Sequence, residues 1–137
     1  MIQLKKYILI PFCLFFSSMT YADVVVIVNA DNAASIDAAS VKKIFLGKSK
    51  TFSDGSSAIP INLTGSDEVR TDFNSKVLGK KDSQVKAIWS RLIFSGRATP
   101  PKELSGLELV EFVSKNKDAI GYVEASVATD AVKAISF

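Results

Sequence analysis

The apolar residues of this chain gather in short runs that polar turns separate. Residues 23–28 are Val and Ile after a single Asp, without alternation, which is typical of a strand covered on both faces. We expect this run to be the central strand of a sheet. Residues 58–63, 119–123 and 132–137 predict three more strands. Pro60 places part of the first of these at a sheet edge or at the beginning of the strand.

Apolar residues spaced three and four positions apart predict helices between these strands. The first helix begins after its cap, Asp37, and ends at Gly47, which suits a left-handed turn. The second begins at Ser66 and ends at Gly79, and the third begins at its cap, Asp82. The apolar stripes of these helices comprise, in order, Val41, Ile44 and Phe45; Val69, Phe73 and Val77; and Val85, Ile88, Trp89, Leu92 and Ile93.

The third stripe is the strongest helix signal in the chain. Trp89 lies in its middle, so we expect the ring to pack in the core rather than against a cofactor. A fourth helix follows the break at Pro100-Pro101, where Ser105 and Glu108 form a capping box ahead of further apolar residues. Three helices therefore separate the second and third strands, and the alternation of strands and helices indicates an α/β domain.

The N-terminal segment has the pattern of an export signal. Two lysines precede an almost uninterrupted apolar run at 7–16, and Thr20 and Ala22 are small residues of the kind that signal peptidase accepts. The run is shorter than the roughly 20 residues of a membrane span. We therefore expect a cleaved signal peptide at 1–22, export to the periplasm, no membrane insertion after cleavage, and one domain at 23–137.

Cleavage would change the composition of the chain. It leaves 115 of the 137 residues, with 15 basic and 14 acidic side chains and a net charge of +1, and it removes Cys13, the only cysteine. A nearly neutral balance offers no stripe for a nucleic-acid backbone, so we expect no nucleic-acid partner. The chain also has no histidine, so it lacks the usual soft-metal ligands and the commonest general base. We expect no metal, no cofactor and no catalytic residue.

The start of the second helix is the candidate for a binding site. Because a strand leads into it, unpaired backbone N–H groups and the positive end of the helix dipole face the turn, as in anion sites. The candidate anion ligands are Thr64, Ser66, the amides of Asp67 and Glu68, and Arg70. The alternative, that Ser66 is an ordinary N-cap followed by acids that compensate the dipole, stays open.

Gly121 is a second candidate for the same site. A glycine within a strand either lets a neighbouring element pack closely or lets a ligand approach the backbone. Packing is the commoner of the two. The ligand alternative would make Gly121, with Tyr122 beside it, the floor of the anion site.

Several strings of this sequence, in their order and spacing, are similar to those of a known family. They are Val28-Asn29, residues 41–48, Gly65-Ser66 with Arg70 and Phe73, residues 89–94 followed by Gly96 and Pro100-Pro101, and residues 119–123. In these strings the chain resembles the phosphate-type periplasmic substrate-binding proteins of ABC importers, and most closely a group of short, single-lobe relatives. The resemblance extends over essentially all of residues 23–137.

The resemblance implies a single lobe of a type II periplasmic-binding-protein-like fold, with a mixed sheet flanked by helices. It implies a solute-binding protein that captures a small oxyanion, phosphate by default, and that is not an enzyme. Ser66 matches the family's anion-holding helix start, and Arg70 matches a position after it. The implied partners are an ABC permease and, because one lobe leaves its ligand half solvated, a second lobe or a second copy of the chain.

The chain departs from the family at this same helix start. Asp67 and Glu68 follow Ser66 where the family has glycine and threonine, and two carboxylates repel an anion unless they turn outward. The alternative function is therefore a ligand-free interaction module of the cell envelope that docks a protein partner. An exposed apolar patch and self-association would favour that alternative.

Overall fold

The structure, a computed structural model, describes residues 11, 23–65 and 67–137. The expected signal peptide, apart from Pro11, and Ser66 therefore lie outside the described residues. In chain order the elements are β1 (Val24–Asn29), α1 (Ala38–Phe45), β2 (Ile59–Leu63), α2 (Glu68–Phe73), the π-helical turn η1 (Asn74–Leu78), α3 (Asp82–Phe94), β3 (Lys102–Leu104), α4 (Gly106–Lys115), β4 (Ala119–Glu124), the 3-10 turn η2 (Ala125–Val127) and β5 (Val132–Ile135). None of the helices in the described part has the length and hydropathy to cross a membrane.

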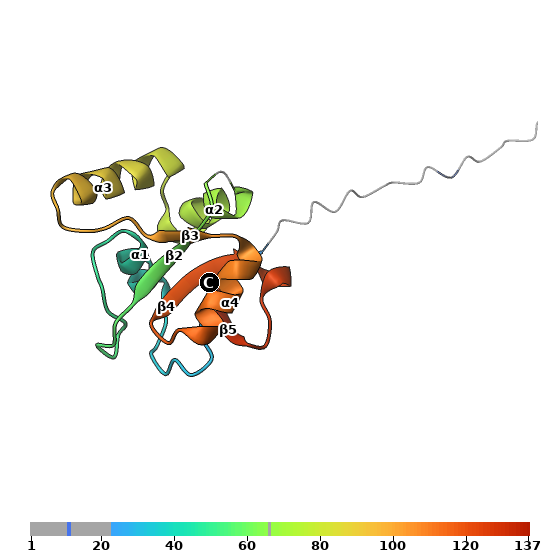
Figure 1. The fold of residues 1–137 in the computed structure, drawn as a ribbon. Coiled ribbons are helices and arrows are strands. Elements are labelled where there is room, and N and C mark those ends of the chain that lie inside the picture. Colours follow the sequence, from blue (N-terminus) through green and yellow to red (C-terminus); the bar gives the residue numbers. More distant parts are fainter. Residues whose placement is uncertain (1–10, 12–22, 66) are drawn as a thin grey trace, which may run out of the picture.

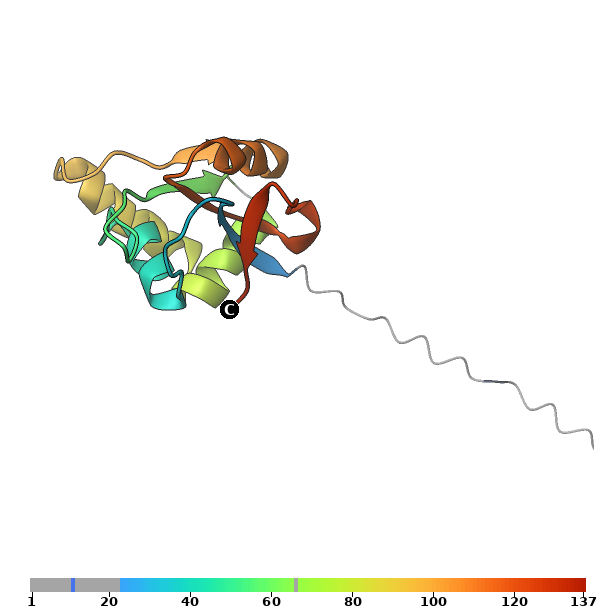
Figure 2. The same cartoon turned by 90° about the horizontal axis from the view of Figure 1, so that it is seen from below.

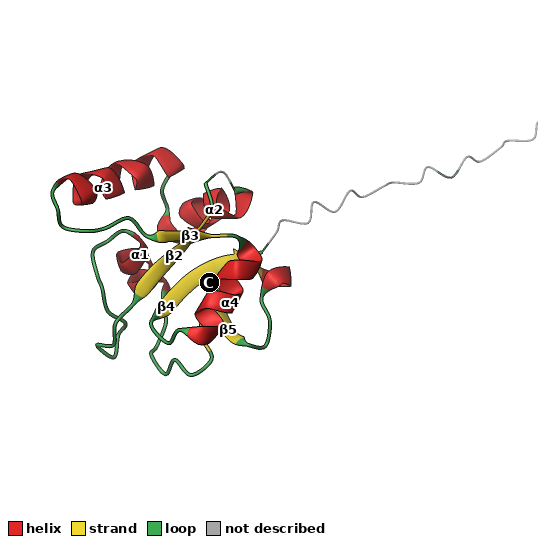
Figure 3. Cartoon of the chain, viewed as in Figure 1, coloured by secondary structure: helices red, strands yellow, loops and turns green. Residues whose placement is uncertain are grey.

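Five strands form one mixed sheet in the order β3-β2-β4-β1-β5. Strand β2 runs parallel to β3 and β4, whereas β1 runs antiparallel to β4 and β5. The mixed sheet between flanking helices confirms the predicted fold class (Figure 3). The central strand is β4, however, and the expectation that β1 is central was wrong. A strand next to the centre is also covered on both faces, so it carries the same unbroken apolar run.

Strand β3 forms an edge of the sheet that the sequence did not predict. It has three residues, Lys102–Leu104, of which the two charged ones are exposed. Its sequence therefore shows no periodic pattern of apolar residues that would predict a strand. It pairs with β2 only from Ile61 onward, whereas Pro60 faces β4 alone. The proline therefore lies near the beginning of its strand, as predicted, where its missing N–H costs no bond to β3.

Helices cover both faces of this sheet (Figures 1 and 2). Helix α4 packs on one face, against β4 and β1, while α1, α2 and η1 lie on the other. Residues of β4 point alternately to the two layers. A Cβ added to Gly121 would overlap the Leu109 side chain of α4. The Tyr122 ring stacks on Phe73 with centroids 3.9 Å apart and also meets Phe45 edge-on. Gly121 thus serves close packing of α4.

Most local helix signals lie where the sequence predicts them. The Asp37 carboxylate caps α1 by accepting the Ser40 N–H at 2.7 Å, and Ser105 with Glu108 forms the capping box of α4. Helix α1 ends before Gly47, whose φ of 72° is a left-handed conformation that glycine adopts without strain.

Two helix caps differ from the prediction. The N-cap of α2 is Asp67 and not Ser66, because its Oδ1 accepts the Val69 N–H at 2.8 Å. An aspartate does this as well as a serine and also complements the helix dipole with its charge. Asp82 is the first residue of α3 and not its cap, which is Lys81.

Helix α3 buries only part of its apolar stripe. Val85 belongs to the core, and Ile88 and Trp89 pack against it as expected, whereas the end of the stripe does not. Figure 1 shows α3 beyond the β3 edge, where it packs against η1 and the end of α1. Of its described residues only Val85 is buried, while Ile93 is 40% and Phe94 91% exposed. Trp89 is half-buried, and its Nε1–H donates to the carbonyl oxygen of Phe45 at 2.9 Å. Because other helices already cover both faces of the sheet, the end of this stripe at Ile93 stays at the surface and lines a pocket.

Candidate functional site

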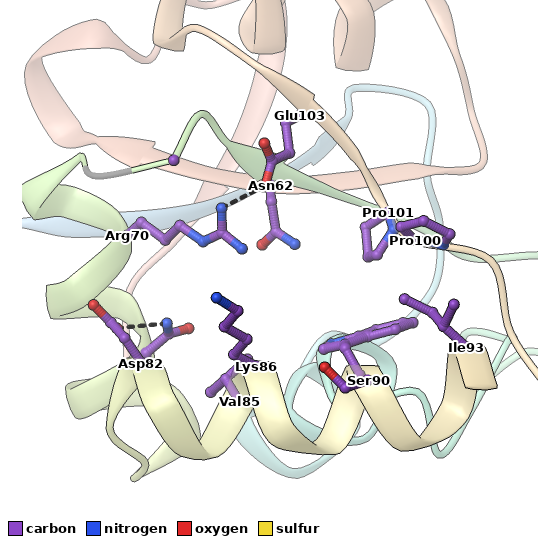
Figure 4. A pocket seen from close by; sticks show the side chains of 13 residues that line it. Asn62, Arg70, Asp82, Val85, Lys86, Ser90, Ile93, Pro100, Pro101 and Glu103 are labelled. Atoms are coloured by element: carbon purple, nitrogen blue, oxygen red, sulfur yellow. Dashed lines mark hydrogen bonds and ion pairs between the residues drawn. The ribbon is translucent and has the colours of Figure 1, made fainter. Parts of the chain in front are cut away.

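A pocket of about 440 Å³ lies between α3 and the strands β2 and β3 (Figure 4). Its polar lining residues are Asn62, Arg70, Asn74, Asp82, Lys86, Ser90 and Glu103. Its apolar lining residues are Val85, Trp89, Ile93, Pro100 and Pro101, and Gly65 completes the wall. The volume is in the range of about 300–1,000 Å³ that is typical of sites for small molecules.

Arg70 ties α2 to the edge of the sheet at one end of this pocket. Its Nη1 donates to the carbonyl oxygen of Leu63 at 3.1 Å and to Oε1 of Glu103 at 2.6 Å. Both bonds use the same nitrogen, and Figure 4 shows the rest of the guanidinium reaching toward Asn62 across the pocket. The Glu103 carboxylate compensates the charge of Arg70 but leaves part of its planar fork available for another acceptor.

Asn62 is held in place from inside the core. The buried Tyr122 hydroxyl donates to Asn62 Oδ1 at 3.0 Å and accepts the Leu63 N–H at 3.3 Å. Burial raises the pKa of Tyr122 above its ordinary value, so the hydroxyl stays protonated and can donate. The Nδ2 group of Asn62 makes no hydrogen bond to a described residue and is left as a donor at the pocket.

Lys86 contributes the second cation of the pocket. Figure 4 shows its ammonium group rising from α3 toward the space between Arg70 and Asn62. Among the described residues it has no hydrogen bond and no ion pair, in contrast to Arg70. The polar end of the pocket therefore brings together three kinds of donor, an ammonium, a guanidinium and a carboxamide, that can all bind an anion.

Asp82 is the second acid at this end, and its partners are neutral. Its two carboxylate oxygens accept hydrogen bonds from Asn74 Nδ2 at 2.8 Å and from the Thr71 hydroxyl at 2.7 Å. The bonds from Asn74 and then Thr71 hold the pKa of the Asp82 carboxyl below its ordinary value. Asp82 therefore stays ionised. The positive charges of Arg70 and Lys86 and the negative charges of Asp82 and Glu103 then sum to zero in this pocket.

This arrangement predicts a pH-dependent contribution of Asp82 to stability. Because the folded pKa lies below that of the unfolded chain, about 4 for Asp, the two bonds stabilise the fold above about pH 4 and lose this effect as pH falls through the folded value. Asp82→Asn should therefore be less stable than the wild type at neutral pH, with a difference that shrinks in acid. Urea unfolding at stepped pH measures it. Asp130→Asn, at an exposed turn, is the control for charge removal alone, and a difference that persists in acid would contradict the assignment.

Of the residues expected at the helix start that the structure describes, only Arg70 lines this pocket. Thr64 is exposed, and its N–H and hydroxyl both approach the carbonyl oxygen of Leu104, at 3.1 and 3.4 Å. Of the two amides expected to hold the anion, that of Asp67 donates to the Thr64 carbonyl oxygen at 3.3 Å. The Asp67 carboxylate accepts the Val69 N–H, and Ser66 lies outside the described residues. An anion at the turn itself would meet this carboxylate.

Gly121 and Tyr122 lie in the core rather than at a site floor. Both are buried in β4, and neither lines the pocket. Tyr122 touches the pocket only through Asn62. Among the described residues, Arg70 alone of the sequence-predicted anion ligands lines this pocket, while Gly121 and Tyr122 lie in the core.

The sequence had no signal for the role of Lys86. A lysine on an amphipathic helix is usually a solvated surface residue, and only the position of α3 across the pocket gives Lys86 its neighbours. The same holds for Asn74, whose place in a π-helical turn is not readable from a local pattern.

Comparisons with known proteins show which solved structures have a similar fold. Neither a protein-family model nor a curated protein matches the sequence. An ABC-type phosphate transport receptor from Vibrio cholerae superposes with a TM-score of 0.63 at 15% identity, over 82% of this chain and 45% of that one. A phosphate ABC transporter substrate-binding protein with bound phosphate from Clostridium perfringens gives 0.62 at 18% identity, over 82% and 44%.

PstS from Borrelia burgdorferi is similar to the same degree, with a TM-score of 0.62 at 13% identity, over 83% of this chain and 46% of that one. The chain therefore spans less than half the length of the solved structures that it matches. At these identities the likeness concerns the fold. This chain has the fold of part of a phosphate-transport binding protein, a mixed sheet with helices on both faces.

Proposed function

We propose that the chain is a secreted solute-binding protein that captures a small oxyanion, phosphate being the first candidate. Its fold is that of proteins named for phosphate transport. The observation that carries the proposal is the convergence of Lys86, Arg70 and Asn62 at one end of a single pocket. These groups donate hydrogen bonds to an anion, and no bond needs to be made or broken in the process.

The anion would lie at the polar end of this pocket rather than in the turn before α2. Lys86 would supply an unpaired charge, Arg70 the free side of its guanidinium, and Asn62 its Nδ2 group. Thr64 and the Asp67 amide already donate to the carbonyl oxygens of Leu104 and Thr64, respectively. Because one lobe leaves the pocket open on one side, we expect weak binding unless an ABC permease, a second lobe or a second copy covers it.

Phosphate should stabilise the protein by mass action. At about a hundred times its dissociation constant a ligand raises the free energy of unfolding by roughly 2.7 kcal/mol, which thermal unfolding of protein purified from cells expressing the full chain would detect. Lys86→Gln should weaken binding about tenfold, equivalent to ~1.4 kcal/mol. Lys42→Gln removes the same charge from an exposed position on α1, outside the pocket, and should leave affinity unchanged. No shift with phosphate, sulfate or small carboxylates would contradict the proposal.

The alternative function, an interaction module of the cell envelope, is favoured by the exposed end of α3. Ile93 and Phe94 are exposed there, and Arg91 and Arg97 lie close by in sequence. Such a patch is typical of protein contacts. In that case light scattering of the purified protein should show self-association that Phe94→Ser abolishes and Phe137→Ser, also at an exposed ring, does not. A monomer at all concentrations that binds phosphate would exclude this alternative.

A further inference from the structure

The pocket beside α3 has two chemically different ends. Lys86, Arg70 and Asn62 gather at one end, and Ile93, Pro100 and Pro101 lie together at the other (Figure 4). Trp89 lines the same pocket and is only half-buried. The exposed part of the apolar stripe of α3 therefore forms part of this wall.

The volume of the pocket exceeds what inorganic phosphate needs. About 440 Å³ corresponds to roughly fifteen water molecules at ~30 Å³ each, whereas phosphate has only five heavy atoms. Phosphate at the polar end would leave the apolar wall in contact with water. A ligand that covers this wall would gain the free energy of removing apolar surface from water.

The charges of the pocket also limit the charge that the anionic headgroup of a ligand can carry. Arg70 is paired with Glu103 at 2.6 Å, and Lys86 shares the pocket with an ionised Asp82 on the same helix. Since these charges cancel, the net charge of the pocket gives a multiply charged anion no advantage over a singly charged one. A headgroup with one negative charge matches the one unpaired ammonium group, and apolar contacts must supply the remaining affinity.

We propose that the ligand of this pocket is an organic anion, with one singly charged headgroup joined to a compact apolar body such as a ring. The inference rests on the proposed binding function and specifies its ligand class. The headgroup binds Lys86, Arg70 and Asn62. The body lies against Trp89, Ile93 and the two prolines.

Calorimetry with two sulfonates tests this inference on protein purified from cells expressing the full chain. Benzenesulfonate and methanesulfonate have the same singly charged, tetrahedral headgroup and differ only in the apolar body. We expect benzenesulfonate to bind at least tenfold more tightly and to change the fluorescence of Trp89, the only tryptophan of the chain. Ile93→Ser should reduce the preference, whereas Phe94→Ser, at a neighbouring exposed residue outside the pocket, should not.

A parallel titration with inorganic phosphate distinguishes the organic-anion inference from the proposed binding function on which it rests. Equal affinity for both sulfonates, or tighter binding of phosphate than of benzenesulfonate, would overturn the organic-anion inference and leave the binding function standing. A preference for benzenesulfonate that Ile93→Ser does not change would also overturn it, because the ring would then bind elsewhere. Absence of binding for all three anions would overturn the binding function, and the inference with it.

Discussion

Replacing Phe73 with alanine is expected to lower the free energy of unfolding by about 3–5 kcal/mol, the largest effect of a single substitution that we predict. Phe73 is fully buried. Its ring stacks on Tyr122 with centroids 3.9 Å apart and meets Phe45 edge-on at 4.9 Å. Truncation removes these contacts and leaves a cavity between α2 and the central strand, and urea unfolding of the purified protein measures the loss.

Phe94→Ala provides a matched control for this substitution. The residue type and the change are the same, but Phe94 lies at the end of α3 and is 91% exposed. Its truncation should change stability by no more than about 0.5 kcal/mol. Equal effects of the two substitutions would mean that the aromatic cluster of Phe45, Phe73 and Tyr122 is not the core of this domain.

Tyr122→Phe is expected to cost about 1–3 kcal/mol, although it keeps the stacked ring. The missing hydroxyl leaves two buried groups without a partner, the Leu63 N–H and Asn62 Oδ1, which lie 3.3 and 3.0 Å from it in the wild type. Asn62 also loses the bond that fixes its side chain at the pocket. We therefore expect weaker anion binding together with the lower stability, measured by calorimetry and by urea unfolding.

A double-mutant cycle separates the two consequences of this change. If the hydroxyl acts on the pocket through Asn62, then Tyr122→Phe should weaken binding in the wild type but have little further effect in the Asn62→Ala background. Additive losses of affinity in the double variant would show that Tyr122 affects the pocket by another route. In either case the stability measurement is a separate readout of the buried bonds.

The position of α3 connects the fold to the proposed function. Had the whole stripe of α3, including Ile93, packed in the core, it would have left no apolar wall at the pocket. Because α3 lies beyond the β3 edge instead, Lys86 and Trp89 come to line the same pocket as Arg70. The binding properties of this chain therefore depend on where one helix docks.

The sequence by itself determined the local elements of this protein. The cap at Asp37, the left-handed glycine at Gly47 and the capping box at Ser105 each depend on residues within a few positions of one another. Unbroken apolar runs likewise predicted β1 and β4. Such signals are readable because caps and turns are satisfied by near neighbours in the chain.

Only the tertiary structure decided which surfaces of these elements are buried and which stay exposed. The same apolar pattern is compatible with a central or a neighbouring strand, and the stripe of α3 is compatible with a core or with a pocket wall. Asp67, rather than Ser66, caps α2, and Tyr122 fixes Asn62 from a strand 60 positions away. Strand order, helix docking and long-range hydrogen bonds depend on which surfaces remain uncovered once the other elements have packed, and a local pattern does not carry that information.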